Sequence, residues 1–218
     1  MARLLVATRS EHKLREIRQI LGDCGAELVS LVDLDVQPAP EEDAIECFDS
    51  FAGNAIAKAA WFCERTGHPT VADDSGIVVP ALGGRPGVLS RRFAETLGVN
   101  PDESERDATN TALLLQQAAA LAGADRGAYY ACVAALALPD PADRRRVRSM
   151  RIFTGTCGGL LATEPRGSGG FGYDPVFFVP ELEATFAEVP PEAKHRLSHR
   201  ARAFRALASV LPGAITGA

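Results

Sequence analysis

The hydrophobic pattern of the chain begins with a strand, a helix and a second strand. Residues 3–7 form a short apolar run that is typical of a buried strand. Between residues 11 and 21, leucine and isoleucine recur at helical spacing, and Gly22 ends this predicted helix. A second apolar run over residues 27–31 completes a β-α-β start, which favours an α/β fold.

The middle of the chain continues with two Ala-rich helices and a hairpin. The helices are predicted over residues 51–65 and 109–122. The almost wholly apolar run 129–138 suits a buried central strand. A polar turn rich in arginine connects it to a half-exposed strand over residues 147–156, so the two strands are expected to pair antiparallel.

A short strand and a helix complete the pattern. The strand is predicted over residues 176–179, and the helix follows Ser198 with an apolar stripe along one face. The sequence contains no internal repeat and no low-complexity linker. We therefore expect a single α/β domain over residues 1–218, built on a mixed β-sheet flanked by helices, with the antiparallel hairpin as a lobe.

Composition and charge narrow the classes of function. A chain of 218 residues with 46% hydrophobic residues can bury a substantial core without disulfides or structural metals. The net charge of −5 argues against a protein that wraps nucleic acid, so any phosphate ligand requires local cations or a metal. The five cysteines are widely spaced, and we expect them to be buried and reduced. The first apolar run is too short for a signal peptide or a membrane span, which predicts a cytoplasmic protein with no membrane partner.

The first motif lies where the first strand ends and the first helix begins. Free backbone N–H groups and the helix dipole attract anions at such a junction, and a lysine adds a positive charge. The alternative is that Ser10 only caps the helix and Lys13 is a surface lysine. The residues of this motif are Thr8, Arg9, Ser10, Glu11, His12 and Lys13.

The second motif is the acidic segment Asp73, Asp74, Ser75 and Gly76, which interrupts two apolar runs. We expect it to follow a core strand, with at least one carboxylate at the end of that strand. Carboxylates in such a position suit magnesium, which takes one or two of them together with substrate phosphates. An ordinary turn is the alternative, because aspartate, serine and glycine all favour turns.

A glycine-rich segment over residues 167–172 formally matches the dinucleotide-binding pattern G-x-G-x-x-G. We reject that interpretation, because Pro165 precedes the segment and a strand, not a helix, follows it. The segment is better interpreted as a backbone wall around a planar ligand. The alternative is a β-bulge or hairpin turn with a core phenylalanine.

A basic segment over residues 194–200 precedes the last helix. Ser198 is the expected N-cap, which places His199 and Arg200 in the first helical turn. Cations there oppose the helix dipole, so their presence is more understandable if a ligand acceptor or a carboxylate lies opposite. A solvated basic face is the alternative.

Taken together and in order, these segments resemble the family of inosine/xanthosine triphosphate pyrophosphatases, which act on deaminated purine nucleotides. The resemblance implies Mg²⁺-dependent hydrolysis between the α- and β-phosphates, giving a nucleoside monophosphate and pyrophosphate. It also implies an elongated α/β fold and a homodimer. The most specific blocks are residues 72–76 (ADDSG), 86–90 (PGVLS), 169–177 (GGFGYDPVF) and 198–200 (SHR).

The resemblance also assigns roles to individual residues. Asp74 matches the proton acceptor and metal-linked aspartate, Glu46 the metal-binding glutamate, and Ser75 a residue next to substrate. Residues 8–13 match the triphosphate-binding segment, and Lys58 is expected to add charge there because it shares a helix face with Asn54. The positions that match nucleoside-binding residues are Phe171, Gly172, Tyr173, Asp174, Lys194, His199 and Arg200.

Chemical complementarity supports the same assignment. Lysines and magnesium offset triphosphate charge and stabilise the departing pyrophosphate. Hypoxanthine and xanthine offer an acceptor at O6 and a donor at N1, where adenine offers the reverse. Donors such as His199 and Arg200 and an acceptor such as Asp174 are left unpaired against adenine, which discriminates by about 10⁴. Phe171 is expected to stack on the base.

The sequence departs from the family pattern at three places. Ser10 stands where an asparagine is usual, Cys47 and Phe48 replace a typical Thr-Gly pair, and Gly53 replaces a glutamate. Two alternatives stay open, and the departures at Ser10, Cys47 and Phe48 motivate the second. One is a pyrophosphatase for other modified nucleotides, and the other is a nucleotide-binding regulator without turnover.

Overall fold

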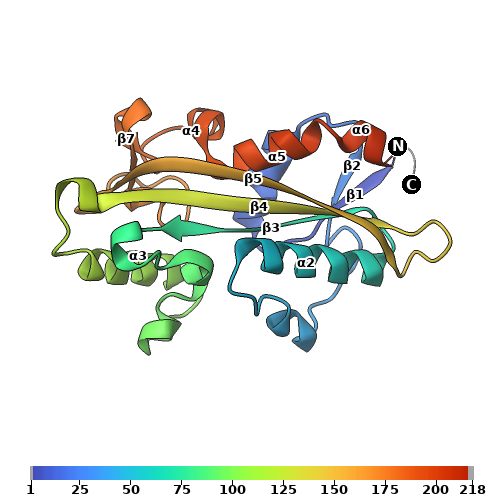
Figure 1. Cartoon of the computed structure of the whole chain (residues 1–218), viewed down its shortest axis with the longest axis horizontal. Helices are drawn as coiled ribbons and strands as arrows, with labels where there is room; N and C mark the ends of the chain where they lie inside the picture. The colour runs from blue at the N-terminus through green and yellow to red at the C-terminus, as the bar shows by residue number, and fades with distance from the viewer. Residues whose placement is uncertain (1, 216–218) are drawn as a thin grey trace. The chain divides into compact units, whose positions relative to one another are not determined.

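Seven strands form one mixed sheet in the order β2-β1-β3-β4-β5-β6-β7 in the computed structural model, which describes residues 2–215 (Figure 1). β1 pairs parallel with β2 and β3, whereas β6 pairs antiparallel with β5 and β7. The expected mixed α/β sheet is therefore confirmed. The strands are β1 (Arg3–Val6), β2 (Glu27–Ser30), β3 (Thr70–Val78), β4 (Gly127–Pro139), β5 (Val147–Leu161), β6 (Phe177–Val179) and β7 (Ala184–Thr185).

Six α-helices accompany the strands over the described residues. They are α1 (Glu11–Leu21), α2 (Phe51–Thr66), α3 (Arg106–Gln117), α4 (Pro191–Leu197), α5 (His199–Ala208) and α6 (Leu211–Ile215).

The chain folds into two compact units. The first unit comprises Met1–Asp74, Cys132–Gly155 and Arg200–Ala218, and the second comprises Ser75–Ala131 and Thr156–His199. β3, β4 and β5 each contribute residues to both units.

The first unit buries two apolar layers, one on each face of its strands, because successive side chains of a strand point to opposite faces. Leu4 and Val6 of β1 pack in one cluster with Phe204 of α5. Leu5 packs in the other cluster with Phe62 of α2. Accordingly, α5 and α6 cover one face and α2 covers the other (Figure 1).

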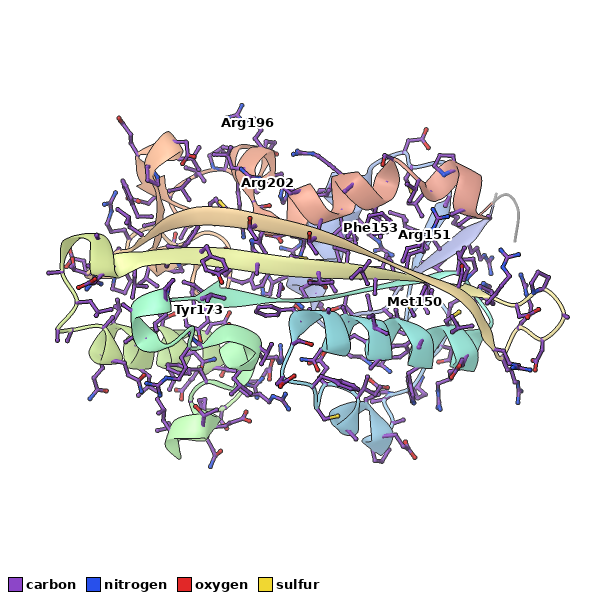
Figure 2. All side chains as sticks on the ribbon, viewed as in Figure 1. Met150, Arg151, Phe153, Tyr173, Arg196 and Arg202 are labelled. Carbon is purple, nitrogen blue, oxygen red and sulfur yellow. The ribbon has the colours of Figure 1, made fainter. Side chains whose placement is uncertain are left out.

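The hairpin strand β5 follows the same alternation in the first unit. Phe153 packs against the cluster that contains α5, and Met150 packs against the cluster that contains α2. Figure 2 shows these two side chains on opposite sides of the ribbon. The predicted hairpin is confirmed by the turn itself, in which the Asp140 N–H donates to the Arg146 carbonyl at 2.8 Å.

The second unit has its own apolar core. Leu114 of α3, Tyr130 of β4, Phe177 of β6 and Phe186 pack together in one cluster of buried side chains. Tyr173, labelled in Figure 2, belongs to the same cluster, and its hydroxyl donates to the carbonyl of Ser90 at 2.8 Å. These contacts anchor the end of the glycine-rich segment, which Tyr173 directly follows, to the core of the second unit.

Most predicted elements are confirmed, and their errors lie at the boundaries. α1 spans the residues expected, and Gly22 is its C-cap. The helix predicted over 109–122 is displaced, because α3 begins at Arg106 and ends at Gln117. β5 runs five residues further than expected, since Leu160 and Leu161 pair with β6. The sequence pattern did not predict α4 or β7.

The largest correction concerns the acidic segment, which is neither a turn nor the end of a strand. β3 runs without interruption from Thr70 to Val78, so Asp73 and Asp74 lie inside it. A strand tolerates buried carboxylates at these positions because each has polar or cationic partners from neighbouring elements. Gly76 serves close packing, since a Cβ there would overlap the Ser90 hydroxyl oxygen.

All five cysteines are free thiols, but the expectation that all are buried is wrong for one of them. Cys24, Cys63, Cys132 and Cys157 are buried, and Cys47 is exposed. Cys47 lies in the polar loop before α2, which contributes little to the core. Among residues 2–215, no helix is both long and apolar enough to cross a membrane.

Arg126 organises the end of α3 in the second unit. Its guanidinium donates to the carbonyls of Leu161 and Ala162 at 2.6 Å each, and to those of Ala118 and Leu121 at 3.1 and 3.3 Å. One side chain therefore satisfies carbonyls at the end of α3 and at the end of β5.

We predict that Arg126→Met lowers the free energy of unfolding by about 2 kcal/mol, because it leaves part-buried carbonyls without donors while keeping the aliphatic stem. Denaturant titration followed by circular dichroism measures the change. Arg145→Met, in the exposed hairpin turn, is the matched control and should shift stability by less than about 0.5 kcal/mol. Equal stabilities of the two variants would contradict this role of Arg126.

Candidate active site

A group of charged side chains surrounds the middle of β3 in the first unit. We call it the carboxylate cluster. Its members come from α1, from the loop before α2, from α2 itself, from β3 and from α5. They are Lys13, Glu16, Glu46, Asn54, Lys58, Asp73, Asp74 and Arg200.

Asp73 and Asp74 point to opposite faces of β3, as consecutive residues of a strand must. Asp73 is on the face of Val71, toward the cluster that contains α5, and its carboxylate contacts Lys13 and Arg200. Asp74 is on the face of Ala72, toward α2, and accepts a hydrogen bond from Asn54 at 2.9 Å. The strand thus gives two neighbouring carboxylates different surroundings.

Asp73 is the centre of a buried ion-pair chain. Its Oδ2 lies 3.3 Å from Lys13 Nζ and 3.2 Å from Arg200 Nη2, and Arg200 Nη1 lies 2.5 Å from Glu16 Oε2. Burial alone would raise the pKa of Asp73, but Lys13, Arg200 and Lys58 outweigh it and hold that pKa far below its ordinary value. Asp73 is therefore a permanent negative charge that fixes the position of Lys13.

Asp74 has the opposite tendency. Burial raises its pKa above the ordinary value, and the nearby charge of Glu46 acts in the same direction. Lys13, Lys58 and the hydrogen bond from Asn54 oppose this rise without cancelling it. Asp74 is therefore the more basic of the two aspartates, which suits a group that accepts a proton.

Lys58 connects α2 to the carboxylate of Glu46 and to the backbone of β3. Its ammonium forms an ion pair with Glu46 and donates to the backbone carbonyl of Asp73 at 3.0 Å. Burial would raise the pKa of Glu46, but Lys58 and then Lys13 outweigh it, so the net shift is downward. Asn54 and Lys58 contact adjacent residues of β3, which confirms that they share one face of α2.

The net charge of the carboxylate cluster is negative, which favours a further cation. Four carboxylates face three cations, Lys13, Lys58 and Arg200, which leaves one net negative charge. Within residues 2–215, no three His, Cys, Asp or Glu side chains converge in the manner of an all-protein metal cage. Glu46 and Asp74 are nevertheless two carboxylates close enough for the charge of Glu46 to act on Asp74. Magnesium typically uses one or two carboxylates and takes its other ligands from water and phosphate, so a pair of this kind accords with such an ion.

Lys13 of the predicted anion-binding segment joins the carboxylate cluster through a direct ion pair with Asp73. Ser10 caps α1 as expected, accepting from the Lys13 N–H at 3.3 Å, and Thr8 Oγ1 accepts from the Ser10 N–H. Glu11 and His12 are exposed at the start of the helix.

Arg9, also predicted to bind phosphate, has a different partner. Its guanidinium holds the carboxylate of Glu42 through two bonds at 2.7 and 3.0 Å and donates to the Val36 carbonyl at 2.8 Å. In this structure it fastens the polar loop that follows β2. That loop also carries Glu46, so Arg9 acts on the carboxylate cluster through the loop.

A second group lies in the second unit, and we call it the aromatic cluster. It combines aromatic rings with one buried ion pair. Its members are Tyr130, Phe171, Asp174, Phe186, Lys194 and His199.

The ion pair joins Lys194 to Asp174 at 2.5 Å, and both side chains are buried. Asp174 Oδ2 also accepts from the Phe171 N–H at 2.9 Å, which turns the glycine-rich segment toward the carboxylate. A Cβ at Gly170 would overlap the same oxygen, so this approach requires glycine. Lys194 Nζ lies 5.0 Å from the centre of the Phe171 ring, a cation–π contact.

His199 stacks on Tyr130 with ring centres 4.5 Å apart and planes 8° from parallel. The Tyr130 hydroxyl donates to Asp174 Oδ1 at 3.5 Å. His199 is therefore a flat donor group held in a fixed orientation next to the ion pair. Ser75, the other residue expected near substrate in the acidic segment, is half-buried within β3.

Other predicted nucleoside-binding residues have structural contacts in the second unit. Tyr173 is buried with its hydroxyl bonded to Ser90, and the Gly172 N–H donates to Asp107 at 2.6 Å. In the first unit, Arg200 directs its guanidinium to Glu16 and Asp73. The basic segment was expected to face either a ligand acceptor or a carboxylate. For Arg200, the partners in this structure are carboxylates of the protein.

Sequence reasoning missed Glu16, Tyr130 and Phe186. Glu16 stands three residues after Lys13 on α1, a spacing that places the two side chains on one face. That spacing was a usable signal, but a glutamate in a helix is ordinarily expected to face solvent. Tyr130 and Phe186 had no signal beyond their apolar character, because their role depends on neighbours far away in sequence.

The sequence and the fold both match known proteins. Residues 4–210 match the sequence model of the Ham1 family. A dITP/XTP pyrophosphatase of Streptomyces coelicolor is 44% identical over 212 residues, which cover 97% of this chain and 98% of that protein. One of Geobacillus kaustophilus is 41% identical over 207 residues, covering 95% and 93%.

Solved structures agree with these sequence matches. The structure of a HAM1 protein from Coxiella burnetii has 34% sequence identity and a TM-score of 0.80, covering 98% of this chain and all of that one. The Ham1 protein of Staphylococcus aureus has 30% identity and a TM-score of 0.78, covering 97% and 98%. Because the match extends over nearly the whole sequence and is repeated by the fold, the chain belongs to the Ham1 family.

Proposed function

We propose that this protein is a nucleoside triphosphate pyrophosphatase that hydrolyses deaminated purine nucleotides, ITP, dITP and XTP, to a nucleoside monophosphate and pyrophosphate. The observation that carries the proposal is the carboxylate cluster, where a basic carboxylate, Asp74, lies among Glu46, Lys13 and Lys58. The names of the relatives, dITP/XTP pyrophosphatases, support the same reaction.

Asp74 is the proposed catalytic base. It accepts a proton from a water molecule whose oxygen forms a bond to the α-phosphorus, while the bond from that phosphorus to the α,β-bridging oxygen breaks and pyrophosphate departs. The raised pKa of Asp74 favours proton acceptance, and Asn54 holds the carboxylate at a fixed angle. Lys13 and Lys58 offset the negative charge that grows on the pyrophosphate.

Glu46 and Asp74 are the proposed ligands of Mg²⁺. When bound, the ion polarises phosphate oxygens and neutralises part of the triphosphate charge. In this structure Lys58 pairs with Glu46, and the Glu46 charge raises the pKa of Asp74. A second cation near these two carboxylates is therefore electrostatically favourable.

The aromatic cluster is the proposed binding site for the purine ring of the substrate. Phe171 offers a ring for stacking, His199 and Lys194 offer donors, and Asp174 offers acceptor oxygens. This set complements O6 and N1 of hypoxanthine or xanthine and leaves buried groups unpaired against adenine. Ser75, Gly172 and Tyr173 belong to the proposed substrate-binding set through the resemblance, and Arg200 acts on it by holding Asp73 in place.

We further propose that the chain acts as one functional domain, as a homodimer and in the cytoplasm. One domain accords with a family match that begins in the first unit, includes the second and ends in the first. The second unit exposes Tyr129 and Leu160 of β4 and β5, apolar side chains suited to an interface.

The substrate preference tests the main proposal. With Mg²⁺, purified protein is expected to release pyrophosphate from ITP and XTP at least about 10²-fold faster than from ATP, because adenine leaves buried donors and acceptors unpaired. A coupled assay for pyrophosphate across purine and pyrimidine triphosphates measures this. Equal rates on ATP, or orthophosphate as the product, would refute the proposal.

Asp74→Asn is the control for a contaminating hydrolase, since it removes the proton acceptor but preserves shape. It should bind ITP and lose nearly all turnover. A wild-type protein that binds ITP tightly without producing pyrophosphate would instead be a nucleotide-binding regulator, and a preference for a modified pyrimidine triphosphate would identify a different pyrophosphatase.

Phe48 and Gly53 form a coupled pair next to Asn54, the residue that holds the proposed catalytic base, Asp74. A Cβ at Gly53 would lie 2.7 Å from Phe48 Cβ, so a side chain at position 48 requires glycine at position 53. The Phe48 N–H donates to Asn54 Oδ1 at 2.9 Å, and Asn54 Nδ2 donates to Asp74 at 2.9 Å. Two of the departures from the family pattern thus compensate each other sterically, next to the backbone N–H that holds Asn54.

Gly53→Ala is expected to lower kcat about tenfold, because it displaces the backbone at Phe48 and loosens Asn54 against Asp74. Phe48→Gly combined with Gly53→Ala should restore most of the rate, since the clash is removed. Steady-state kinetics on ITP measures both, with Gly158→Ala, where a Cβ meets open space, as the matched control. A double variant as slow as Gly53→Ala would contradict the coupling.

Light scattering after gel filtration tests the homodimer. The expected mass is twice the 23.1 kDa of the chain, because apolar side chains exposed on strands favour burial against a second copy. A mass of 23.1 kDa at micromolar concentration would contradict the dimer.

A further inference from the structure

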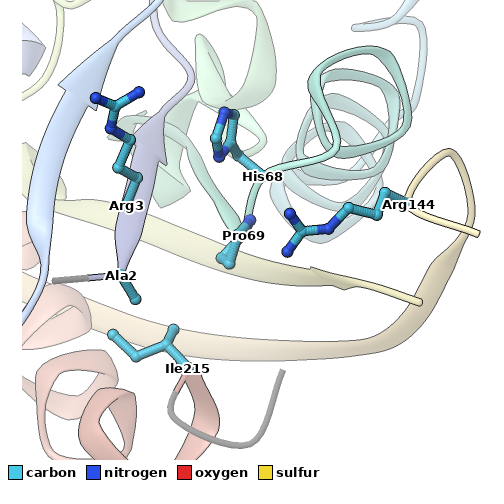
Figure 3. Close-up of a pocket in the computed structure, with 6 residues that line it drawn as sticks. All are labelled: Ala2, Arg3, His68, Pro69, Arg144 and Ile215. Atoms are coloured by element: carbon cyan, nitrogen blue, oxygen red, sulfur yellow. The ribbon is translucent and has the colours of Figure 1, made fainter. Parts of the chain in front are cut away.

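A pocket that plays no part in the proposed reaction lies in the first unit, at the start of β1 and β3 and beside the β4–β5 turn. Figure 3 shows the six residues that line it, with His68 between the side chains of Arg3 and Arg144. The lining residues are Ala2, Arg3, His68, Pro69, Arg144 and Ile215. Three of the six are basic and none is acidic.

The positive charge of this pocket is only partly neutralised. Arg3 pairs with Glu27 at 3.2 Å, and both side chains are about half exposed, so water competes for this pair. Over the described part of the chain, no carboxylate forms a salt bridge with Arg144 or with His68. Among residues 2–215, Arg144 therefore lines the pocket with a guanidinium that no carboxylate neutralises.

Both arginines of the pocket act on His68. Burial and then the charges of Arg144 and Arg3 lower the pKa of His68, in accord with the approach of both arginine side chains to it in Figure 3. Gly67 makes this approach possible. Its φ is +68°, and a Cβ there would lie 3.2 Å from Arg144 Cβ, tighter than ordinary contact.

We propose that this pocket is an anion site for a phosphate group, with Arg144 and His68 as its principal donors and Arg3 as a third. The guanidinium fork of an arginine matches the oxygens of a phosphate, and an imidazole adds a further N–H. The remaining lining, Ala2, Pro69 and Ile215, provides no acidic side chain to repel an anion.

The pocket is separate from the carboxylate cluster within the first unit. Pro69 precedes the first residue of β3, and Asp73 lies four residues further along the chain, a distance of roughly 13 Å in extended backbone. On β1, Arg3 is the first residue of the strand, and Lys13 follows only after the strand has ended at Val6. The pocket thus lies at the amino ends of two parallel strands, and Asp73 and Lys13 lie beyond it along the chain.

Two sources of a phosphate group are relevant, free pyrophosphate and the phosphate of a nucleotide. The pyrophosphate needs only the three basic groups. A nucleoside monophosphate would in addition place its sugar or base over Pro69 and Ile215. The phosphate chemistry is common to both, and the experiment separates them.

The test follows the imidazole resonance of His68 in the full-length protein by NMR, assigned with His68→Gln, at constant pH and without divalent metal. Titration with inorganic pyrophosphate, and separately with IMP, is expected to shift this resonance with a Kd on the order of 1 mM. A shift with pyrophosphate supports a site for the free anion, and a shift with IMP alone supports a nucleotide site. No shift with either ligand at about 20 mM, far above that Kd, would overturn the proposal.

Arg144→Gln is expected to weaken this binding about tenfold, because it removes a charged fork. Arg145→Gln changes the adjacent exposed arginine, which does not line the pocket, and should change the Kd less than about twofold. Equal effects of the two substitutions would show a diffuse charge effect and overturn the site. Hydrolysis of ITP is expected to be the same in both variants, so the outcome is independent of the proposed reaction.

Discussion

The buried charge of Asp73 is the constraint on which the first unit depends. A carboxylate that is 1% exposed inside a strand costs several kcal/mol unless cations surround it, and here Lys13 and Arg200 do so. These partners come from α1 and α5, helices that are far apart in sequence. Satisfying one carboxylate therefore fixes two helices against β3 and fixes the ammonium of Lys13, which we propose meets a phosphate of the substrate.

The alternation of a β-strand explains how two adjacent aspartates acquire different properties. Asp73 faces cations and has a strongly lowered pKa, whereas Asp74 faces Asn54 and α2 and has a raised pKa. A turn, which was the alternative interpretation of this segment, would have left both carboxylates in water with similar pKa values. The strand thus gives Asp73 a structural role and leaves Asp74 as a basic group, although the two residues are adjacent in the chain.

The second unit also buries charged side chains, and aromatic rings help to stabilise them. Asp174 and Lys194 are both buried, and each has further contacts, to the Phe171 N–H and to the faces of Phe171 and Phe186. Such contacts offset the cost of removing the pair from water. The glycine-rich segment is thus shaped by one carboxylate. A short 3-10 turn and β6 follow it, whereas a dinucleotide-binding G-x-G-x-x-G segment opens a helix.

The sequence by itself determined the α/β class, most helices, the hairpin and the blocks that carry the family resemblance, because these depend on local periodicity and on short motifs. It also indicated that Asn54 and Lys58 act together, since their spacing fixes a shared helix face. The tertiary structure alone decided that β3 continues through the acidic segment, that Arg200 faces Glu16 and that Phe48 requires Gly53. Each of these depends on charges or volumes brought together from distant segments, and no local pattern records such contacts.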